Sequence, residues 1–126
     1  MSGRSTATNL TFFIDSISRL VDNRSSVDAI YTDFSKAFDR VNHDTLLSKL
    51  NSLGINEPLL SWFQSYLRGR TSKVVVSGYS SDPFPVNSGV PQGSHLAPLL
   101  FNIFINDIGQ CLKNSTYILF VDDLKF

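Results

Sequence analysis

The stretch YILFVDD, residues 117–123, places an apolar run directly before two adjacent acids. Its β-branched and aromatic side chains predict a strand over 117–121, with Asp122 and Asp123 at the end of that strand. Residues 27–33, VDAIYTD, repeat the arrangement, because this second strand pattern also ends on a carboxylate, that of Asp33. In both predicted strands, therefore, an apolar run leads directly into a carboxylate.

The position of these acids indicates a metal site. An ionised carboxylate beside a buried strand loses hydration, and two adjacent carboxylates also repel each other, so a bound cation is the usual reason to keep them. Oxygen ligands favour Mg²⁺, with Mn²⁺ as an alternative, over zinc. If the two strands are neighbours, Asp33, Asp122 and Asp123 form the ligand set of a two-metal site for phosphoryl transfer. The competing interpretation is that Asp122-Asp123 forms an ordinary turn, where aspartate is common.

The remaining pattern predicts an α+β fold, with a mainly antiparallel sheet and helices packed on one face. Apolar residues at helical spacing predict four helices, over residues 6–22, 44–53, 57–67 and 96–112. Two further strands, 70–77 and 83–87, are predicted to form a hairpin around residues 78–81.

Composition narrows the function classes. The chain has 126 residues, 42% of them hydrophobic, so a core is expected, and equal numbers of acidic and basic residues argue against a wide basic surface. One cysteine excludes an internal disulfide and a cysteine-based zinc site. A polar start and the lack of a long apolar run predict an intracellular protein that does not enter a membrane.

Three motifs in a fixed order resemble those of reverse transcriptases. They are YTDFSKAFD at residues 31–39, SGVPQGS at 88–94 and FVDD at 120–123. The phrases DFSKAFDRVNH, LLSWFQSYLRGRT and PLLFNIFINDI are similar to those of non-LTR, LINE-type retrotransposons, in particular the jockey-like ones. The resemblance covers nearly the whole chain. It implies a partial reverse transcriptase domain over 1–126, namely the central part of a polymerase palm with the end of the fingers and without the thumb.

The resemblance also implies roles for individual residues. Asp33, Asp122 and Asp123 are expected to be catalytic and to bind two Mg²⁺ ions, with the backbone carbonyl of Phe34 as a further ligand on the nucleotide side. Phe38 is expected to lie under the incoming sugar, and Gln92 to contact the incoming nucleotide. By position alone, Phe38 is better explained as a core residue than as a contact to the sugar, and the Pro-Gln-Gly stretch around Gln92 as an ordinary loop.

The expected reaction is attack of a primer 3′-hydroxyl on the α-phosphate of a dNTP, directed by an RNA template and leading to retrotransposition in the nucleus or cytoplasm. Arg68, Arg70 and Lys73 form the densest basic group and are expected either to contact nucleic acid or to be simply solvated. Little or no activity is expected of 126 residues alone, and exposed apolar surface is expected to limit solubility. The competing functions are a non-catalytic remnant or nucleic-acid-binding module, and the reverse transcriptase of a mobile intron.

Overall fold

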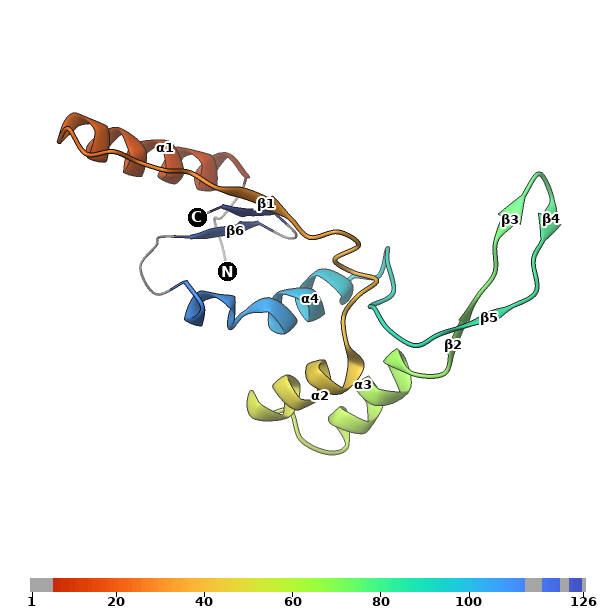
Figure 1. Ribbon diagram of the computed structural model, residues 1–126. Coiled ribbons are helices and arrows are strands. Elements are labelled where there is room, and N and C mark those ends of the chain that lie inside the picture. Colours follow the sequence, from red (N-terminus) through yellow and green to blue (C-terminus); the bar gives the residue numbers. More distant parts are fainter. Residues whose placement is uncertain (1–5, 113–116, 121–122, 126) are drawn as a thin grey trace. The chain divides into compact units, whose positions relative to one another are not determined.

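The computed structural model describes residues 6–112, 117–120 and 123–125. It divides into two compact units, and both are drawn in Figure 1. The sheet unit consists of Met1–Ser35 with Ile108–Phe126, and the helical unit consists of Lys36–Asp107. Each unit has its own arrangement of helices and antiparallel strands, so the predicted α+β class is confirmed.

The sheet unit contains a three-stranded antiparallel sheet in the order β1-β7-β6. The strands are β1 (Tyr31–Asp33), β6 (Ile118–Phe120) and β7 (Asp123–Lys125), and the unit also holds helix α1 (Thr6–Asp22) and a 3₁₀ turn, η1 (Ile108–Gln110). Strand β7 was not expected from the sequence. The strand predicted over 117–121 therefore does not lie next to β1, because β7 lies between them.

Helix α1 matches its predicted range, but its apolar stripe is only partly covered. The ring of Phe13 meets that of Tyr31 edge-on, with the centroids 5.8 Å apart, and α1 also contacts β6. Ile17 is half-buried, whereas Leu10, Ile14 and Val21 are 51%, 54% and 56% exposed. Strands of three residues are too short to cover a helix of 17 residues, which is why the expected core contact is incomplete.

The helical unit is built on α2 (His43–Ser52), α3 (Leu59–Leu67) and α4 (Ala97–Ile105). Asn42 caps α2, because its side chain accepts a hydrogen bond of 2.9 Å from the backbone N–H of Thr45. Gly54, at φ +88°, follows the end of the helix, and the N–H of Ile55 returns to the carbonyl of Leu50. The predicted helices over 44–53 and 57–67 are confirmed with small shifts at their ends.

Helix α4 ends earlier than the predicted range of 96–112. It stops at Ile105, and residues 108–110 form the separate turn η1. The helix ends there because Asn106, Asp107 and Gly109 have low helix propensity. The apolar run in the sequence continues beyond this point, which is why the predicted helix was too long.

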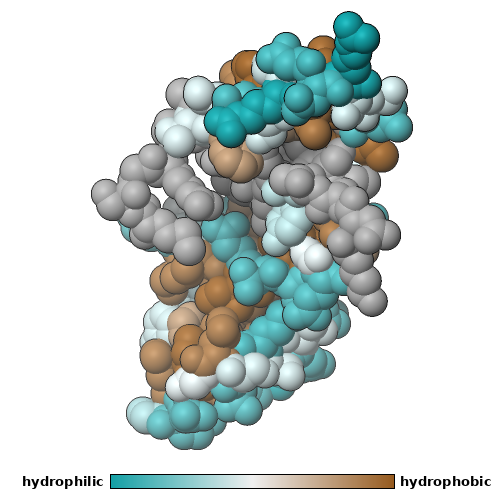
Figure 2. All heavy atoms as spheres, turned by 90° about the vertical axis from the view of Figure 1, so that its left-hand side faces the viewer, coloured by the Kyte–Doolittle hydropathy of each residue, from teal (hydrophilic) through white to brown (hydrophobic). Residues whose placement is uncertain are grey.

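The helical unit has a core of its own, and every buried side chain belongs to it among the residues whose burial the structure describes. Leu46, Leu50, Leu67, Leu100 and Val41 are fully buried. Apolar residues also reach the surface of this unit, and Figure 2 shows a hydrophobic area in the lower part of its view, where α2 and α3 lie. The predicted exposure of apolar surface is thus present on both units.

A long two-stranded ribbon extends from the helices of this unit (Figure 1). It consists of β2 (Arg70–Ser72) paired with β5 (Phe84–Val86), followed by β3 (Val75–Val76) paired with β4 (Tyr79–Ser80). The predicted hairpin is confirmed, but its turn is at Ser77-Gly78 and not at 78–81. Ser77 and Gly78 have φ values of +50° and +84°, the conformation that two-residue hairpin turns require.

One ion pair of the helical unit gives a pH-dependent prediction. Lys49 Nζ donates to Asp107 Oδ1 at 2.5 Å, and this hydrogen bond lowers the pKa of Asp107 below its usual 3.8. Because the folded pKa is depressed, the contact stabilises the fold above pH 3.8 and is lost as the pH falls through the lowered pKa. NMR titration of Asp107 should give a midpoint below 3.8 that Lys49→Met raises and Lys73→Met leaves unchanged.

In the part of the chain that the structure describes, no helix has the length and apolar character needed to cross a membrane.

Candidate functional site

Two of the predicted acidic positions come together in the sheet unit. Asp33 is the last residue of β1, Asp123 is the first of β7, and the antiparallel register places them directly opposite each other. Directly opposed Cα atoms in such a pair are about 4.5–5.5 Å apart. This pairing of Asp33 with Asp123 is made through β7, whereas the sequence predicted that the strand before it would lie next to β1.

The third predicted acid, Asp122, lies outside the described residues. Among the residues that the structure does describe, no group of three or more potential metal-binding side chains is gathered. Asp33 is exposed at the end of its strand, and the half-buried Phe34 follows it directly. Two opposed aspartate positions carry carboxylate oxygens, the kind of donor that Mg²⁺ and Mn²⁺ prefer, whereas typical zinc sites use sulfur and nitrogen donors.

The second motif forms a loop that is fixed against the first motif within the helical unit. We call residues 88–92 the motif loop. The N–H of Gly89 donates to the carbonyl of Val41 and the N–H of Val90 donates to that of Phe38, both at 2.8 Å. Ser88 Oγ donates to the carbonyl of Asp39, also at 2.8 Å. The backbone of the loop is thus joined to residues 38–41 in the manner of a short sheet, although neither segment is a regular strand.

Gly89 is required at the closest point of this contact. Its φ is +82°, a conformation that side chains other than glycine adopt rarely. A Cβ atom there would lie 2.7 Å from Asp39 Cα and 2.7 Å from the carbonyl oxygen of Phe38. Neither backbone atom can move without breaking the loop contacts, so the close approach depends on the absence of a side chain.

Two cationic or polar side chains hold the same turn from the other side. The carbonyl oxygen of Gly89 accepts from His43 Nε2 at 2.8 Å and from an Arg70 guanidinium nitrogen at 2.6 Å. Because a carbonyl can only accept, His43 carries a proton on Nε2. Arg70 also donates to the carbonyls of Ser88 and Leu67, at 3.1 and 2.9 Å. His43 is buried, which agrees with a structural role.

Gln92 is exposed at the end of the motif loop, and Asp39 holds its amide. Gln92 Nε2 donates to Asp39 Oδ1 at 2.8 Å. Phe38, next to Asp39, is half-buried and packs against Phe101 with 5.1 Å between the ring centroids. Phe38 therefore has a packing contact within its unit and an exposed part as well.

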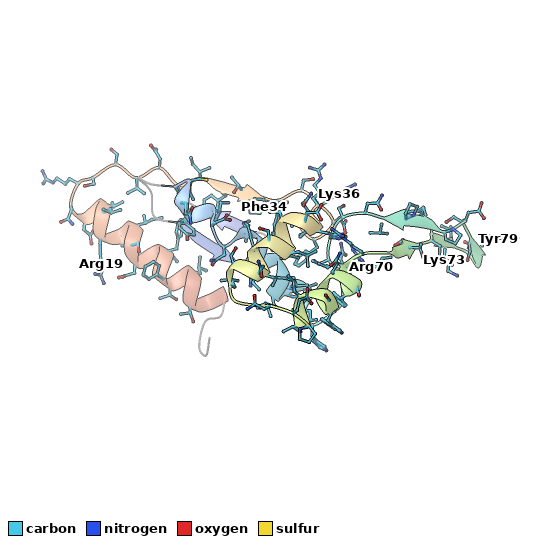
Figure 3. All side chains as sticks on the ribbon, turned by 90° about the horizontal axis from the view of Figure 1, so that it is seen from below. Arg19, Phe34, Lys36, Arg70, Lys73 and Tyr79 are labelled. Atoms are coloured by element: carbon cyan, nitrogen blue, oxygen red, sulfur yellow. The ribbon has the colours of Figure 1, made fainter. Side chains whose placement is uncertain are left out.

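The basic group predicted to contact nucleic acid is distributed along the start of the ribbon, as Figure 3 shows for Arg70 and Lys73. Arg68 forms an ion pair with Asp44, and three carbonyl oxygens accept from Arg70. These internal partners give both arginines a structural role that the sequence did not indicate. Lys73 is exposed on the ribbon.

The sequence interpretation missed the residues that position the loop. Asp39 and His43 were assigned no function, and Gly89 was noted only as part of a motif. Their contacts join positions more than 45 residues apart, such as 46 for His43 to Gly89, so no local pattern reveals them. The available signal was the glycine directly before Val-Pro, which indicates a turn with special backbone geometry.

Comparison with known proteins identifies a family that covers the whole chain and relatives that cover most of it. Residues 1–126 match the family model for reverse transcriptase (RNA-dependent DNA polymerase). The probable RNA-directed DNA polymerase from transposon BS of Drosophila melanogaster is 37% identical over 106 residues, 84% of this chain and 12% of that protein. The RNA-directed DNA polymerase from mobile element jockey of the same organism is 39% identical over 88 residues, 70% of this chain and 10% of that protein.

The fold has a counterpart among solved structures. The apo telomerase of Candida tropicalis, truncated from its C-terminal domain, superposes with a TM-score of 0.69 at 18% sequence identity. The match covers 98% of this chain and 29% of the telomerase chain. The chain therefore shares its fold with part of a larger protein, and it spans about a tenth of the length of the curated relatives it matches.

Proposed function

Because the chain belongs to the reverse transcriptase (RNA-dependent DNA polymerase) family, we propose that it supplies the central palm of an enzyme that extends a DNA primer on an RNA template. The proposed reaction is transfer of a nucleotide from a dNTP to the primer 3′-hydroxyl, with release of pyrophosphate. The observation that carries the proposal is the register that sets Asp33 opposite Asp123 at one end of the sheet. The work of this enzyme within its element is retrotransposition, in the nucleus or cytoplasm.

Asp33 and Asp123, together with Asp122, would hold divalent ions, and Mg²⁺ is the proposed species. Bound there, two ions would lower the pKa of the primer hydroxyl and neutralise charge on the triphosphate. The protein's own part would be to keep acidic positions opposite each other on paired strands, where the repulsion between carboxylates favours binding of a cation. The backbone carbonyl of Phe34 is a further proposed ligand.

The helical unit would supply the contacts to the incoming nucleotide. Phe38, held against Phe101, would lie under the sugar and limit the room for a 2′-hydroxyl. Gln92 would contact the nucleotide from the end of the motif loop. Support comes from the hydrogen bonds that fix this loop to residues 38–41, since a preorganised contact holds a substrate in place at lower entropic cost.

The retrotransposon reading is favoured over that of a mobile intron, because the matched relatives include transposon BS, jockey and the X-element of Drosophila melanogaster. Arg68, Arg70 and Lys73 remain the proposed contacts to the nucleic-acid backbone. Arg70 would make such a contact while it keeps its hydrogen bonds to the carbonyls of Ser88 and Gly89 in the motif loop. We propose that the 126 residues alone have little or no activity.

The test is primer extension by a chimaera. In the polymerase from transposon BS, the matching segment is replaced by this chain, and incorporation is measured with an RNA template, a DNA primer, dNTPs and Mg²⁺. Extension that requires all four and stops on chelation of Mg²⁺ supports the proposal. An inactive chimaera beside an active parent polymerase contradicts it, and favours the non-catalytic remnant.

A further inference from the structure

The contact between Asp39 and Gln92 assigns a direction to the amide of Gln92. Gln92 Nε2 lies 2.8 Å from Asp39 Oδ1. A carboxylate only accepts hydrogen bonds, so the NH₂ group of the amide must face Asp39. The carbonyl oxygen, Oε1, is then left as the acceptor that the exposed side chain offers to its surroundings.

Both partners are held by their backbones. The carbonyl of Asp39 accepts from Ser88 Oγ at 2.8 Å, and the N–H of Asp39 closes a turn onto the carbonyl of Lys36 at 3.0 Å. On the other segment, Gly89 and Val90 are joined to residues 41 and 38. Four hydrogen bonds between the segments 38–41 and 88–92, with Gly89 at their closest approach, thus fix the distance that the two side chains span.

We propose that Asp39 is a positioning residue, which holds Gln92 so that its Oε1 accepts a hydrogen bond from a donor group of the incoming nucleotide. This inference rests on the proposed function, and it adds that Gln92 accepts, and does not donate, the hydrogen bond to the nucleotide. Without Asp39 the amide can rotate and present its NH₂ group to the nucleotide. Two donor groups then face each other, and no hydrogen bond forms between them. The residue acts through Gln92 and does not itself touch the substrate.

The kinetic test compares Asp39→Ala with Asp39→Asn in the chimaera described above. Asparagine keeps an oxygen that can accept from Gln92, whereas alanine has none. Asp39→Ala should raise the KM for dNTP about tenfold, the effect of losing one charge-assisted hydrogen bond, and change kcat by less than about threefold. Asp39→Asn should stay within about threefold of the parent KM. Asp82→Ala, which makes the same chemical change at an exposed aspartate of the helical unit outside the motif loop, is the matched control and should leave KM unchanged.

A double variant separates positioning from a general loss of structure. In a Gln92→Met background, Asp39→Ala should have no further effect on KM, because the group that Asp39 orients has gone. The proposal is overturned if Asp39→Ala raises KM equally with and without Gln92. It is also overturned if alanine and asparagine at position 39 behave alike, whether both raise KM or neither does.

A structural readout keeps this test distinct from failure of the proposed function. In the 126-residue chain, the side-chain NH₂ signals of Gln92, identified by their loss in Gln92→Met, should be displaced from those of a free amide. Asp39→Ala should return them to the free values, and Asp39→Asn should not. If the chimaera is inactive, this measurement alone decides, and free-amide signals in the unmodified chain would disprove the contact.

Discussion

Asp33→Asn and Asp123→Asn should each lower primer extension by the chimaera about a thousandfold or more, with little change in folding. Each substitution keeps the size of the side chain but removes the charge that holds a divalent ion. Metal ions contribute several kcal/mol of transition-state stabilisation in such reactions, and each 1.36 kcal/mol corresponds to a factor of about ten in rate. Both variants should act alike, because the register makes the two positions direct partners.

The matched control is Asp28→Asn, an exposed aspartate of the sheet unit that precedes β1. It makes the same chemical change five positions before Asp33 and should retain the activity of the parent chimaera. Circular dichroism should show equal helix content in all three variants. Full activity in Asp33→Asn or Asp123→Asn would remove that residue from the site, and loss of activity in Asp28→Asn would indicate a general effect of charge.

The second large effect is expected at the motif loop. Gly89→Ala should lower the free energy of unfolding of the helical unit by about 2–5 kcal/mol, the sum of the left-handed backbone cost and of overpacking. A Cβ atom at this position lies 2.7 Å from two backbone atoms, so the loop and residues 38–41 must separate. In the chimaera the same change should also abolish extension, since Gln92 follows on the same loop.

Gly93→Ala provides a close control. Gly93 has φ +81° against +82° for Gly89, but no atom lies within 4 Å of its Cβ position. Its substitution should therefore cost only the backbone term, about 1–2 kcal/mol. Denaturant unfolding of the two variants measures the difference directly. Equal destabilisation would show that the close approach of the loop to Asp39 does not exist in solution.

Much of the fold could be predicted from local pattern. The helices at 6–22, 44–53 and 57–67 have continuous periodicity and clear ends, such as the glycine after α2, and all three are present. Strand β7 could not be predicted, because three residues with a charge at each end carry no alternating signal. The core was also hard to place, since Leu10 and Ile14 have the spacing of buried residues but little to pack against.

For the candidate site, the motif residues could be selected from the sequence but their supports could not. Asp33 and Gln92 lie in recognisable sequence motifs. The residues that hold the motif loop, Asp39, His43 and Arg70, act through contacts to carbonyls or to an amide far along the chain. Because Arg70 is basic, it was predicted either to contact nucleic acid or to be solvated, whereas the hydrogen bonds that it makes to carbonyl oxygens depend on the folded chain.

The central claim, that two distant acidic positions share a divalent cation, can be tested by cleavage with bound iron. Fe²⁺ replaces Mg²⁺ in the chimaera, and ascorbate with peroxide then cuts the backbone next to the ion. Cuts are predicted at two places, beside Asp33 and beside Asp123, and both should disappear together in Asp33→Asn. Cleavage beside one of them alone, or persistence of the cut near Asp123 after that substitution, would contradict a shared site.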